Sequence, residues 1–511
     1  MFRPRLVTFV AVTVFLVGVA SVYGAALAIV FTGASWLYAG PFLAATLFPL
    51  VLYASSNPRL FFLFGLAFTI PLGLSLRFLV HQHMGGEFAI SVNLSDFFLL
   101  PLVVFLARDY YQGYRRDLRL SPVSGWWVGL IALGIYSVAV GPYREMSALE
   151  VIQMLKVWLI FLVIVNECVR ERHFQVVVAG IGANLALNIV VAFLQYSVKH
   201  MLGLGPLGEP SDLRGADMGV YGAGSSVFRV AGLAGHPNLF GPYLAMGITL
   251  MLGILFAGYR GSSKVLAALV AAGGMVCLVL TLSRSGWASF AMAAGTFMMV
   301  LLVMPGLRSR YLGLKMALIG GGGVAAVAFS GTVLRRLFES EPGAFDFRIQ
   351  LIKIAWHMVT AHPILGVGLN TFSYQLANYG PFSYDSLYSV FGKMFPVVHN
   401  VYMIVWAEQG TVGLFLFLAM HATILLMAVR NLRYLGLSDR VFMVSLCAGC
   451  GFLGLMVDDL SSFFMKVETF GRVYWLFVGL IVAAYYWNLR NDAHHRALAG
   501  GVQAAAGQAR Q

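Results

Sequence analysis

Long apolar runs recur along almost the whole chain, and they constrain its fold more than any other feature. The first reaches from Leu6 to Ala54 and is long enough for two membrane-spanning helices. Further runs of roughly span length lie at residues 59–80, 90–107, 124–141, 150–169, 174–198, 238–257, 264–283, 287–304, 313–332, 400–429, 440–457 and 472–489. The period-two alternation typical of a membrane β-barrel is absent. We therefore predict an all-α polytopic integral membrane protein with about 12–14 transmembrane helices.

The composition excludes a soluble domain of this size. Of the 511 residues, 59% are hydrophobic and only 11% are charged, and the mean hydropathy is +0.82. The net charge of +13 could indicate nucleic-acid binding, but the basic residues form short clusters between apolar runs, as in the cytoplasmic loops of membrane proteins. We therefore predict no nucleic-acid partner. Cys447 and Cys450 have the CxxC spacing, yet they lie inside an apolar run, which favours helix packing over a metal or redox site.

The basic clusters also predict the direction of each span. Arg3 and Arg5 precede the first apolar run, which is too long for a signal peptide, so we place a retained N-terminus in the cytoplasm. Alternating the spans from there leaves the segments rich in Arg and Lys on the cytoplasmic side: 108–119, 170–173, 259–264, 308–315, 430–440 and the tail from Arg490. Both termini are then cytoplasmic, and the long turn-rich segments face the opposite side.

The same pattern divides the chain into four parts. We expect residues 1–332 to form transmembrane helices 1–11 with an outer loop at 199–237, residues 333–399 a large periplasmic loop, residues 400–489 the C-terminal transmembrane helices, and residues 490–511 a cytoplasmic tail. In the large loop, the spacing of FRIQLIKIAWHMVT (347–360) predicts an amphipathic helix that lies on the membrane or caps a cavity. We place its apolar face at Ile349, Ile352, Trp356 and Val359, and its polar face at Gln350, Lys353 and His357.

The stretch VHNVYMIVWAEQGTVG (398–413) joins this loop to the next span. His399 and Asn400 stand at the junction, where an imidazole could act as a general base toward a hydroxyl or could simply cap the helix. Glu408 lies about 13 Å further along the helix axis and about half a turn out of phase. It is too distant to orient the imidazole, so we expect it to bond to another helix. His236, His357 and His362 also lie on this predicted side and are rival candidates on chemistry alone.

Three arginines lie on the predicted outer side, where the positive-inside rule disfavours them. Arg229 precedes the span that begins near Asn238, Arg284 stands in a tight turn, and Arg348 opens the amphipathic helix. Guanidinium groups bind phosphate oxygens bidentately and stay charged at any pH, so together these arginines predict a diphosphate site. The turn before Asn238 feeds a helix N-terminus, which also favours an anion. Contacts with lipid headgroups or helix carbonyls are the alternative for each arginine.

Other charged residues lie in or near the spans. We expect Arg77 to pair with Asp96, because they stand at the outer ends of successive spans. Asp458 and Asp459 fall with Glu468 in the last outer segment, which we interpret as a solvated loop. Neither His nor Cys accompanies these acids at ligand spacing, so no metal site is predicted.

Four ordered segments carry a resemblance to a known family. His399-Asn400, followed nine residues later by Gly410-x-x-Gly413, resembles the outer-loop pattern of the O-antigen ligase and O-antigen polymerase (Wzy-like) superfamily. PILGVGLNTF (363–372) resembles the Pro-Leu-Leu-Gly-Val-Gly segment of that family. FRVAGLAGHPNLFGPYLA (228–245) and TLSRSGWASF (281–290) resemble its arginine-containing segments in the same order. The resemblance extends over about residues 90–480, and its specific part lies between 228 and 413.

This resemblance implies a fold like that of the C-type glycosyltransferases and an outward-facing, metal-independent enzyme without a cofactor. Members of this superfamily transfer a glycan from a polyprenyl diphosphate to an acceptor hydroxyl, and inversion is expected at the anomeric carbon. By the same resemblance, Arg229 and Arg284 would hold the diphosphate and His399 would activate the acceptor. We give Arg348 a looser diphosphate-binding role. Supporting roles go to Asn238, Asn400 and Glu408.

The leading interpretation is therefore an O-antigen ligase in the bacterial inner membrane, with its active site facing the periplasm. Its partners would be an undecaprenyl-diphosphate-linked glycan donor, a lipid A–core acceptor and the membrane lipids. The alternative within the class is a polymerase that joins repeat units on the same carrier. The acceptor would then be a growing glycan. A transporter of lipid-linked glycans and a membrane scaffold are alternatives of other classes. The aromatic insert at 373–395 could face sugar rings or only pack within the loop.

Overall fold

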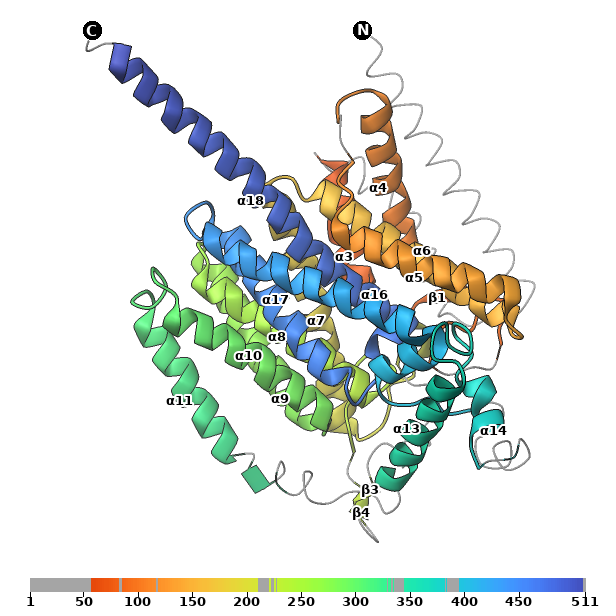
Figure 1. Ribbon diagram of the computed structural model, residues 1–511. Helices are drawn as coiled ribbons and strands as arrows, with labels where there is room; N and C mark the ends of the chain where they lie inside the picture. Colours follow the sequence, from red (N-terminus) through yellow and green to blue (C-terminus); the bar gives the residue numbers. More distant parts are fainter. Residues whose placement is uncertain are drawn as a thin grey trace, which may run out of the picture.

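The computed structural model describes most of the chain after its first 56 residues (Figure 1). The described residues are 57–81, 85–115, 118–209, 220–221, 225–226, 228–328, 330–331, 334, 344–381, 383 and 395–508. The two spans expected between Leu6 and Ala54 lie outside them, as does most of the aromatic insert.

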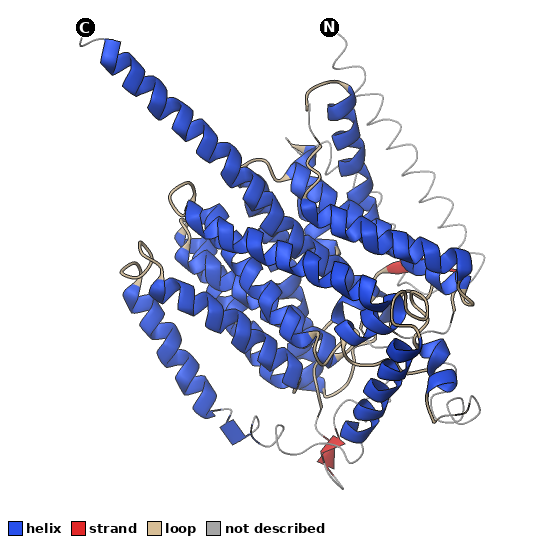
Figure 2. Cartoon of the chain, in the orientation of Figure 1, coloured by secondary structure: helices blue, strands red, loops and turns tan. Residues whose placement is uncertain are grey.

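Most of the described chain is helical (Figure 2). The long helices are α3 (Pro58–Thr69), α4 (Leu94–Tyr111), α5 (Pro122–Val140), α6 (Arg144–Glu167), α7 (Glu171–Val198), α8 (Pro237–Phe256), α9 (Gly261–Leu280), α10 (Arg284–Val303), α11 (Leu312–Ala328), α13 (Ala344–Ala361), α16 (Val401–Asn431), α17 (Asp439–Asp458) and α18 (Glu468–Gln508). The short elements are β1 (Ser75–Phe78), β2 (Ile90–Asn93), η2 (Gly205–Leu207), β3 (Val220–Tyr221), β4 (Ser225–Ser226), η4 (Ser373–Gln375), α14 (Leu376–Tyr379), η5 (Leu432–Tyr434) and η6 (Phe464–Lys466).

Nine helices in the described residues are long and apolar enough to cross a membrane. They are α5 to α10, α16, α17 and the first part of α18, and their bounds lie within a few residues of the predicted runs. α3 and part of α11 are apolar but shorter. The prediction of an all-α polytopic membrane protein is thereby confirmed.

Capping residues explain where many of these helices begin. The side chains of Asn57, Ser121, Ser283 and Ser438 each accept a hydrogen bond from a backbone N–H in the first turn of the following helix. Pro58 and Pro122 occupy first-turn positions that need no intrahelical donor. The spans therefore start at local polar signals, whereas their length is determined by the apolar runs.

The two spans predicted at residues 59–80 and 90–107 differ from the observed structure. Helix α3 ends at Thr69, because Pro71 and Gly73 interrupt the helical pattern. The chain then forms a small antiparallel hairpin in which Ser75 pairs with Asn93, and α4 begins only after β2. At about 18 Å, the twelve-residue α3 is shorter than the apolar layer of a bilayer.

The described helices form one bundle with a distinct cap at one end. α8, α17 and α18 are the most buried of the candidate spans and form the centre of the bundle. α13 and α14 lie together at one end, beside the start of α16, whereas the C-terminal part of α18 leaves the bundle at the opposite end (Figure 1). We call the first of these the cap end.

The amphipathic helix in the predicted large loop is present as α13, but its predicted apolar face is only partly right: Val359 is buried, whereas two other members are exposed. Ile352 and Trp356 are 38% and 49% exposed, whereas the buried face consists of Leu351, Ile354, Ala355 and Met358. This face packs in one cluster with Val398, Ile404 and Ala407 around the start of α16. α13 carries two apolar stripes, and periodicity does not tell which of them the rest of the protein covers.

α16 is broken at Gly410, where φ is +66° and ψ is −170°. The segment that follows α13 is hydrogen-bonded into this break. The backbone bonds run from Val367 N–H to Ala407 O (2.9 Å), Gly368 N–H to Glu408 O (3.0 Å), Thr411 N–H to Pro363 O (2.8 Å) and Val412 N–H to Ile364 O (3.3 Å). Two of the segments that carry the family resemblance, 363–372 and 399–413, therefore form one structural unit.

Replacing Gly366 by alanine is expected to destabilise this unit. Gly366 has a φ of +72°, and a Cβ there would lie 2.4 Å from the backbone carbonyl of Glu408. We expect the free energy of unfolding to fall by about 1–3 kcal/mol, measured by thermal unfolding in detergent. The control is Gly295→Ala in α10, where an added Cβ meets open space and helix propensity improves. If the two variants are equally stable, the close packing of Gly366 against the backbone of α16 is not important for stability.

Candidate active site

His399 lies at the cap end, in the short turn that leads into α16. Asn400 is the N-cap of that helix: its Oδ1 accepts a hydrogen bond from Met403 N–H (2.9 Å). The Asn400 Nδ2 group donates to the Leu460 carbonyl (3.0 Å), and the His399 ring contacts the Phe463 ring edge-on at a centroid distance of 5.1 Å. The turn is therefore held from both sides by the segment between α17 and α18.

The hydrogen bond of the His399 ring determines which nitrogen can accept a proton. Nδ1 lies 3.1 Å from the carbonyl oxygen of Val397, and since a carbonyl only accepts, Nδ1 carries the proton of the neutral ring. The lone pair is then on Nε2. Burial, helped by the positive charge of Arg348, lowers the pKa of His399 to about 4, so the ring is neutral at pH 7. A neutral imidazole with its lone pair on Nε2 can accept a hydrogen bond or a proton there.

Arg229 connects two of the predicted arginine segments. Its side chain is almost fully buried; Nε donates to the Thr281 carbonyl (2.7 Å), and Nη2 donates to Asn238 Oδ1 (2.6 Å). Thr281 lies just before the turn that carries Arg284. The structure therefore brings Arg229 and Asn238 into direct contact and joins both to the start of α10.

His236 lies beside this arginine as the N-cap of α8. Its Nδ1 accepts a hydrogen bond from Asn238 N–H (3.1 Å). Desolvation by the surrounding protein, followed by the electrostatic influence of Arg229 and His399, lowers the pKa of His236 to about 4, although the residue as a whole is exposed. The residue therefore interacts electrostatically with both Arg229 and His399.

The remaining two predicted arginines are also at the cap end. Arg284 is the exposed first residue of α10, whose start packs closely against α8 at Gly241 and Gly286. Arg348 is half-buried on α13, close enough to lower the pKa of His399. The three arginines and His399 thus lie at the same end of the bundle, although 170 positions separate Arg229 from His399 in the sequence.

Asp458 and Asp459 do not lie in a solvated loop, so that interpretation was wrong. Both side chains are fully buried, and none of their carboxylate oxygens has a hydrogen bond of good geometry. The hydroxyls of Ser285 and Ser462 face Asp458, which places this residue beside the start of α10. The backbone carbonyl of Asp459 accepts from Val401 N–H (2.9 Å), and burial next to Asp458 raises the pKa of the Asp459 carboxyl. The last turn of α17 is thus folded into the cap end.

Glu408 bonds to residues other than His399. Its Oε2 lies 3.3 Å from Lys466 Nζ, and the same ammonium is 2.9 Å from Glu150 Oε1 of α6. Burial alone would lower the pKa of Lys466, but the two carboxylates outweigh it and raise that pKa. Glu408 Oε1 accepts from Phe372 N–H (3.2 Å). The Lys466–Glu150–Glu408 triad therefore joins α6, α16 and the α17–α18 segment.

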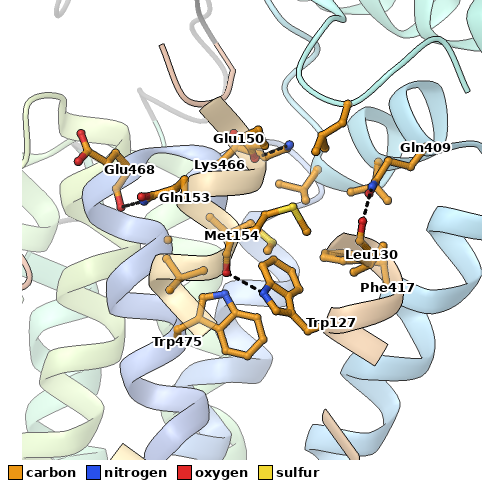
Figure 3. Close-up of a pocket in the computed structure, with 16 residues that line it drawn as sticks. Trp127, Leu130, Glu150, Gln153, Met154, Gln409, Phe417, Lys466, Glu468 and Trp475 are labelled. Carbon is orange, nitrogen blue, oxygen red and sulfur yellow. Dashed lines mark hydrogen bonds and ion pairs between the residues drawn. The ribbon is translucent and has the colours of Figure 1, made fainter. Parts of the chain in front are cut away.

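A cavity of about 50 Å³ lies next to the triad (Figure 3). Glu150, Lys466, Gln153 and Glu468 line one end of it, and the rings of Trp127 and Trp475 line the other (Figure 3). A volume of this size holds a few water molecules and excludes a sugar ring. The cavity is therefore part of the support beneath the site rather than a substrate pocket.

The expected ion pair between Arg77 and Asp96 is absent. Arg77 lies 3.7 Å from Glu468, and Asp96 is 2.9 Å from the Lys156 ammonium. Because Arg77 is in β1 and Asp96 is in the first turn of α4, the hairpin separates their side chains. Glu468 is also buried and paired with Arg472 (2.8 Å), so it too differs from the predicted solvated acid.

Sequence reasoning missed several residues at or beneath the site. His236 was only one of several candidate histidines, and Lys466 received no role. A signal for Lys466 exists, because it is an isolated lysine on the side where the positive-inside rule disfavours basic residues. Within the described part of the chain, no three or more His, Cys, Asp or Glu side chains gather in a way that could hold a metal ion.

The fold and the site define a multi-pass helical membrane protein with a cluster of histidines and arginines at one end of its bundle. Residues 266–418 match the family model described as O-antigen ligase. The matched region runs from α9 into α16 and contains Arg284, Arg348 and His399. It confirms the resemblance to the O-antigen ligase and polymerase superfamily and supports a glycosyltransferase-like activity of that type. No match to a curated protein was found.

Proposed function

We propose that this protein transfers a glycan from a polyprenyl diphosphate to the hydroxyl group of an acceptor sugar, as an O-antigen ligase. The observation that carries the proposal is the convergence at the cap end. His399 lies within the electrostatic reach of Arg348, while Arg229 is tied to the segment that carries Arg284. These residues are the base and the phosphate-binding cations that such a transfer needs.

The arginines have a direct electrostatic role in this reaction. Negative charge grows on the diphosphate as its bond to the sugar breaks, and fixed guanidinium groups stabilise that charge in the transition state. Arg229 is held by Thr281 and Asn238, so its orientation is set before the substrate binds. Arg284 is exposed at the helix start and is accessible to a phosphate from outside. The guanidinium groups of these arginines would therefore neutralise the negative charge on the diphosphate.

His399 takes the proton in the proposed step. The acceptor oxygen forms a bond to the anomeric carbon, and the bond from that carbon to the diphosphate oxygen breaks with its electron pair leaving on the diphosphate. The hydroxyl proton moves to Nε2 of His399, the nitrogen that the bond between Nδ1 and Val397 leaves unprotonated. Attack opposite the leaving group inverts the configuration of the sugar carbon.

The proposal also states which side of the membrane the site faces and which molecule accepts the glycan. The basic segments favour cytoplasmic termini and a cap end on the periplasmic face of the bacterial inner membrane. The donor would be an undecaprenyl-diphosphate-linked glycan and the acceptor lipid A–core. A polymerase that uses a growing glycan as acceptor has the same donor and site, so the test includes both acceptors.

The test uses the purified full-length protein, a polyprenyl-diphosphate glycan and each acceptor in separate reactions. We expect covalent transfer to lipid A–core in the presence of EDTA, because the proposed charge stabilisation comes from arginines. Arg284→Ala should reduce transfer at least about 100-fold, the usual effect of losing one oxyanion-stabilising donor. Arg310→Ala is the control. Arg310 pairs with Asp439 where α10 has ended and α17 begins, at the end of the bundle away from the cap.

Each alternative has its own outcome. Product formed only with the growing glycan as acceptor would replace the ligase by a polymerase. Movement of the lipid-linked glycan across vesicles without a covalent product would identify a transporter. Full activity of Arg284→Ala would refute its role in binding the diphosphate.

A further inference from the structure

Two histidines at the cap end are held in opposite tautomers. Nδ1 of His399 faces the Val397 carbonyl (3.1 Å), so the neutral ring keeps its proton on Nδ1 and its lone pair on Nε2. Nδ1 of His236 accepts from the Asn238 N–H (3.1 Å), so the neutral ring of His236 keeps its proton on Nε2. In each histidine a backbone group determines which ring nitrogen carries the proton. The pair therefore presents one acceptor nitrogen and one donor N–H.

The location of His236 matches a donor toward phosphate. Asn238, whose backbone N–H bonds the His236 ring, also accepts from Arg229 through its side chain (2.6 Å). The His236 ring and the Arg229 guanidinium are thus fixed by the same residue. His236 and His399 are close enough to interact electrostatically when charged, and His236 is an exposed residue. His236 is therefore within electrostatic reach of both the predicted phosphate-binding cation and the predicted base.

A neutral imidazole is an effective hydrogen-bond donor at this position. The two positive charges near it, Arg229 and the partly charged base during reaction, disfavour a third cation. The ring is therefore uncharged at neutral pH and retains its Nε2 proton through the reaction. Such a donor interacts more strongly with an oxygen that gains negative charge than with the neutral ground state.

We propose that His236 is a catalytic residue whose Nε2–H donates a hydrogen bond to the diphosphate oxygen that leaves the sugar. This inference rests on the proposed function. As the bond between the anomeric carbon and the diphosphate oxygen breaks, its electron pair goes to that oxygen, and the His236 hydrogen bond strengthens. The acceptor proton goes to Nε2 of His399, and His236 keeps its own proton. The two rings thus serve opposite ends of one displacement.

Two conservative substitutions separate this role from helix capping. In His236→Asn, the side-chain oxygen takes about the place of Nδ1 and can still cap α8, because Asn is a preferred N-cap residue. No donor then remains at the place of Nε2. In His236→Gln, the amide reaches about the place of Nε2 and can supply an N–H donor, but it is a poorer cap. A purely structural role predicts the reverse order of the two variants.

The experiment measures kcat and KM for the polyprenyl-diphosphate donor, together with thermal unfolding, for both variants in the purified full-length protein. We expect His236→Asn to keep its unfolding temperature and to lose about 10- to 100-fold in kcat, the range for a hydrogen bond to a charged group. KM for the donor should change less than about threefold, because the arginines still bind the diphosphate. His236→Gln should keep most of its kcat and unfold at a lower temperature.

The outcomes distinguish this inference from the proposed function. An unchanged kcat in His236→Asn, with transfer by the wild-type protein intact, overturns the role of His236 alone. Loss of activity in His236→Gln equal to that in His236→Asn also overturns it, because the donor group would then be irrelevant. Absence of transfer by the wild-type protein refutes the proposed function instead.

Discussion

Replacing His399 by alanine is expected to slow glycan transfer about 10²–10⁴-fold, the usual effect of removing a general base. The Nε2 acceptor is lost, so the attacking hydroxyl must give its proton to water. The effect should be in kcat, because the arginines that bind the diphosphate remain. The measurement is single-turnover transfer from the polyprenyl-diphosphate donor, with the unfolding temperature recorded for the same preparation.

His357→Ala is the matched control for this substitution. His357 is an exposed histidine of α13 at the same end of the protein, and its Nδ1 lies 3.0 Å from the Tyr379 carbonyl. It has no role in the proposed reaction, so transfer should stay within about twofold of wild type. Similar losses in both variants would show that His399 acts through the fold of the cap rather than through the proton.

Replacing Lys466 by methionine is expected to have the largest effect on stability. The substitution leaves the carboxylates of Glu150 and Glu408 facing each other with side chains only 9% and 2% exposed. Removing one partner of a buried ion pair typically costs about 3–5 kcal/mol, because an uncompensated charge remains. We expect the free energy of unfolding to fall by about that amount, as measured by chemical unfolding in detergent.

Neutralising the two acids should restore most of the lost stability. In the triple variant Lys466→Met, Glu150→Gln and Glu408→Gln, no buried charge remains, and exchanging a buried ion pair for neutral groups is often nearly neutral. The amides can still accept from the backbone N–H groups of Glu87 and Phe372. If the triple variant is less stable than Lys466→Met alone, repulsion between the carboxylates is not the cause of the loss.

Much of the fold follows from local sequence signals. The apolar runs predicted the spans from α5 to α10 and those of α16 to α18, because a lipid-length apolar helix depends on its own residues and not on its neighbours. The alternation of basic segments predicted that Arg229, Arg348 and His399 share one end of the bundle. This part of the site could be predicted because it depends only on which end of a span each residue occupies.

Apart from the early end of α3, the errors concern contacts that are determined by tertiary packing. Arg77 and Asp96 have partners from α18 and α6, and periodicity contains no information about which of several acids a cation contacts. The burial of Asp458 follows from the packing of α17 against α10 and not from the polarity of its own segment. The docking face of α13 was chosen by the apolar surface near Val398, which no local pattern reveals.

The break at Gly410 also has a consequence for where the proposed chemistry would take place relative to the lipid. From Thr411 to Asn431, α16 is about 30 Å long, which already equals the thickness of the hydrocarbon layer of a bilayer. The part of α16 after the break is therefore long enough to cross that layer without the turns before it. In the proposed reaction, this would place His399 at a height that a hydrophilic sugar chain can reach, while a lipid-anchored donor approaches from the membrane plane.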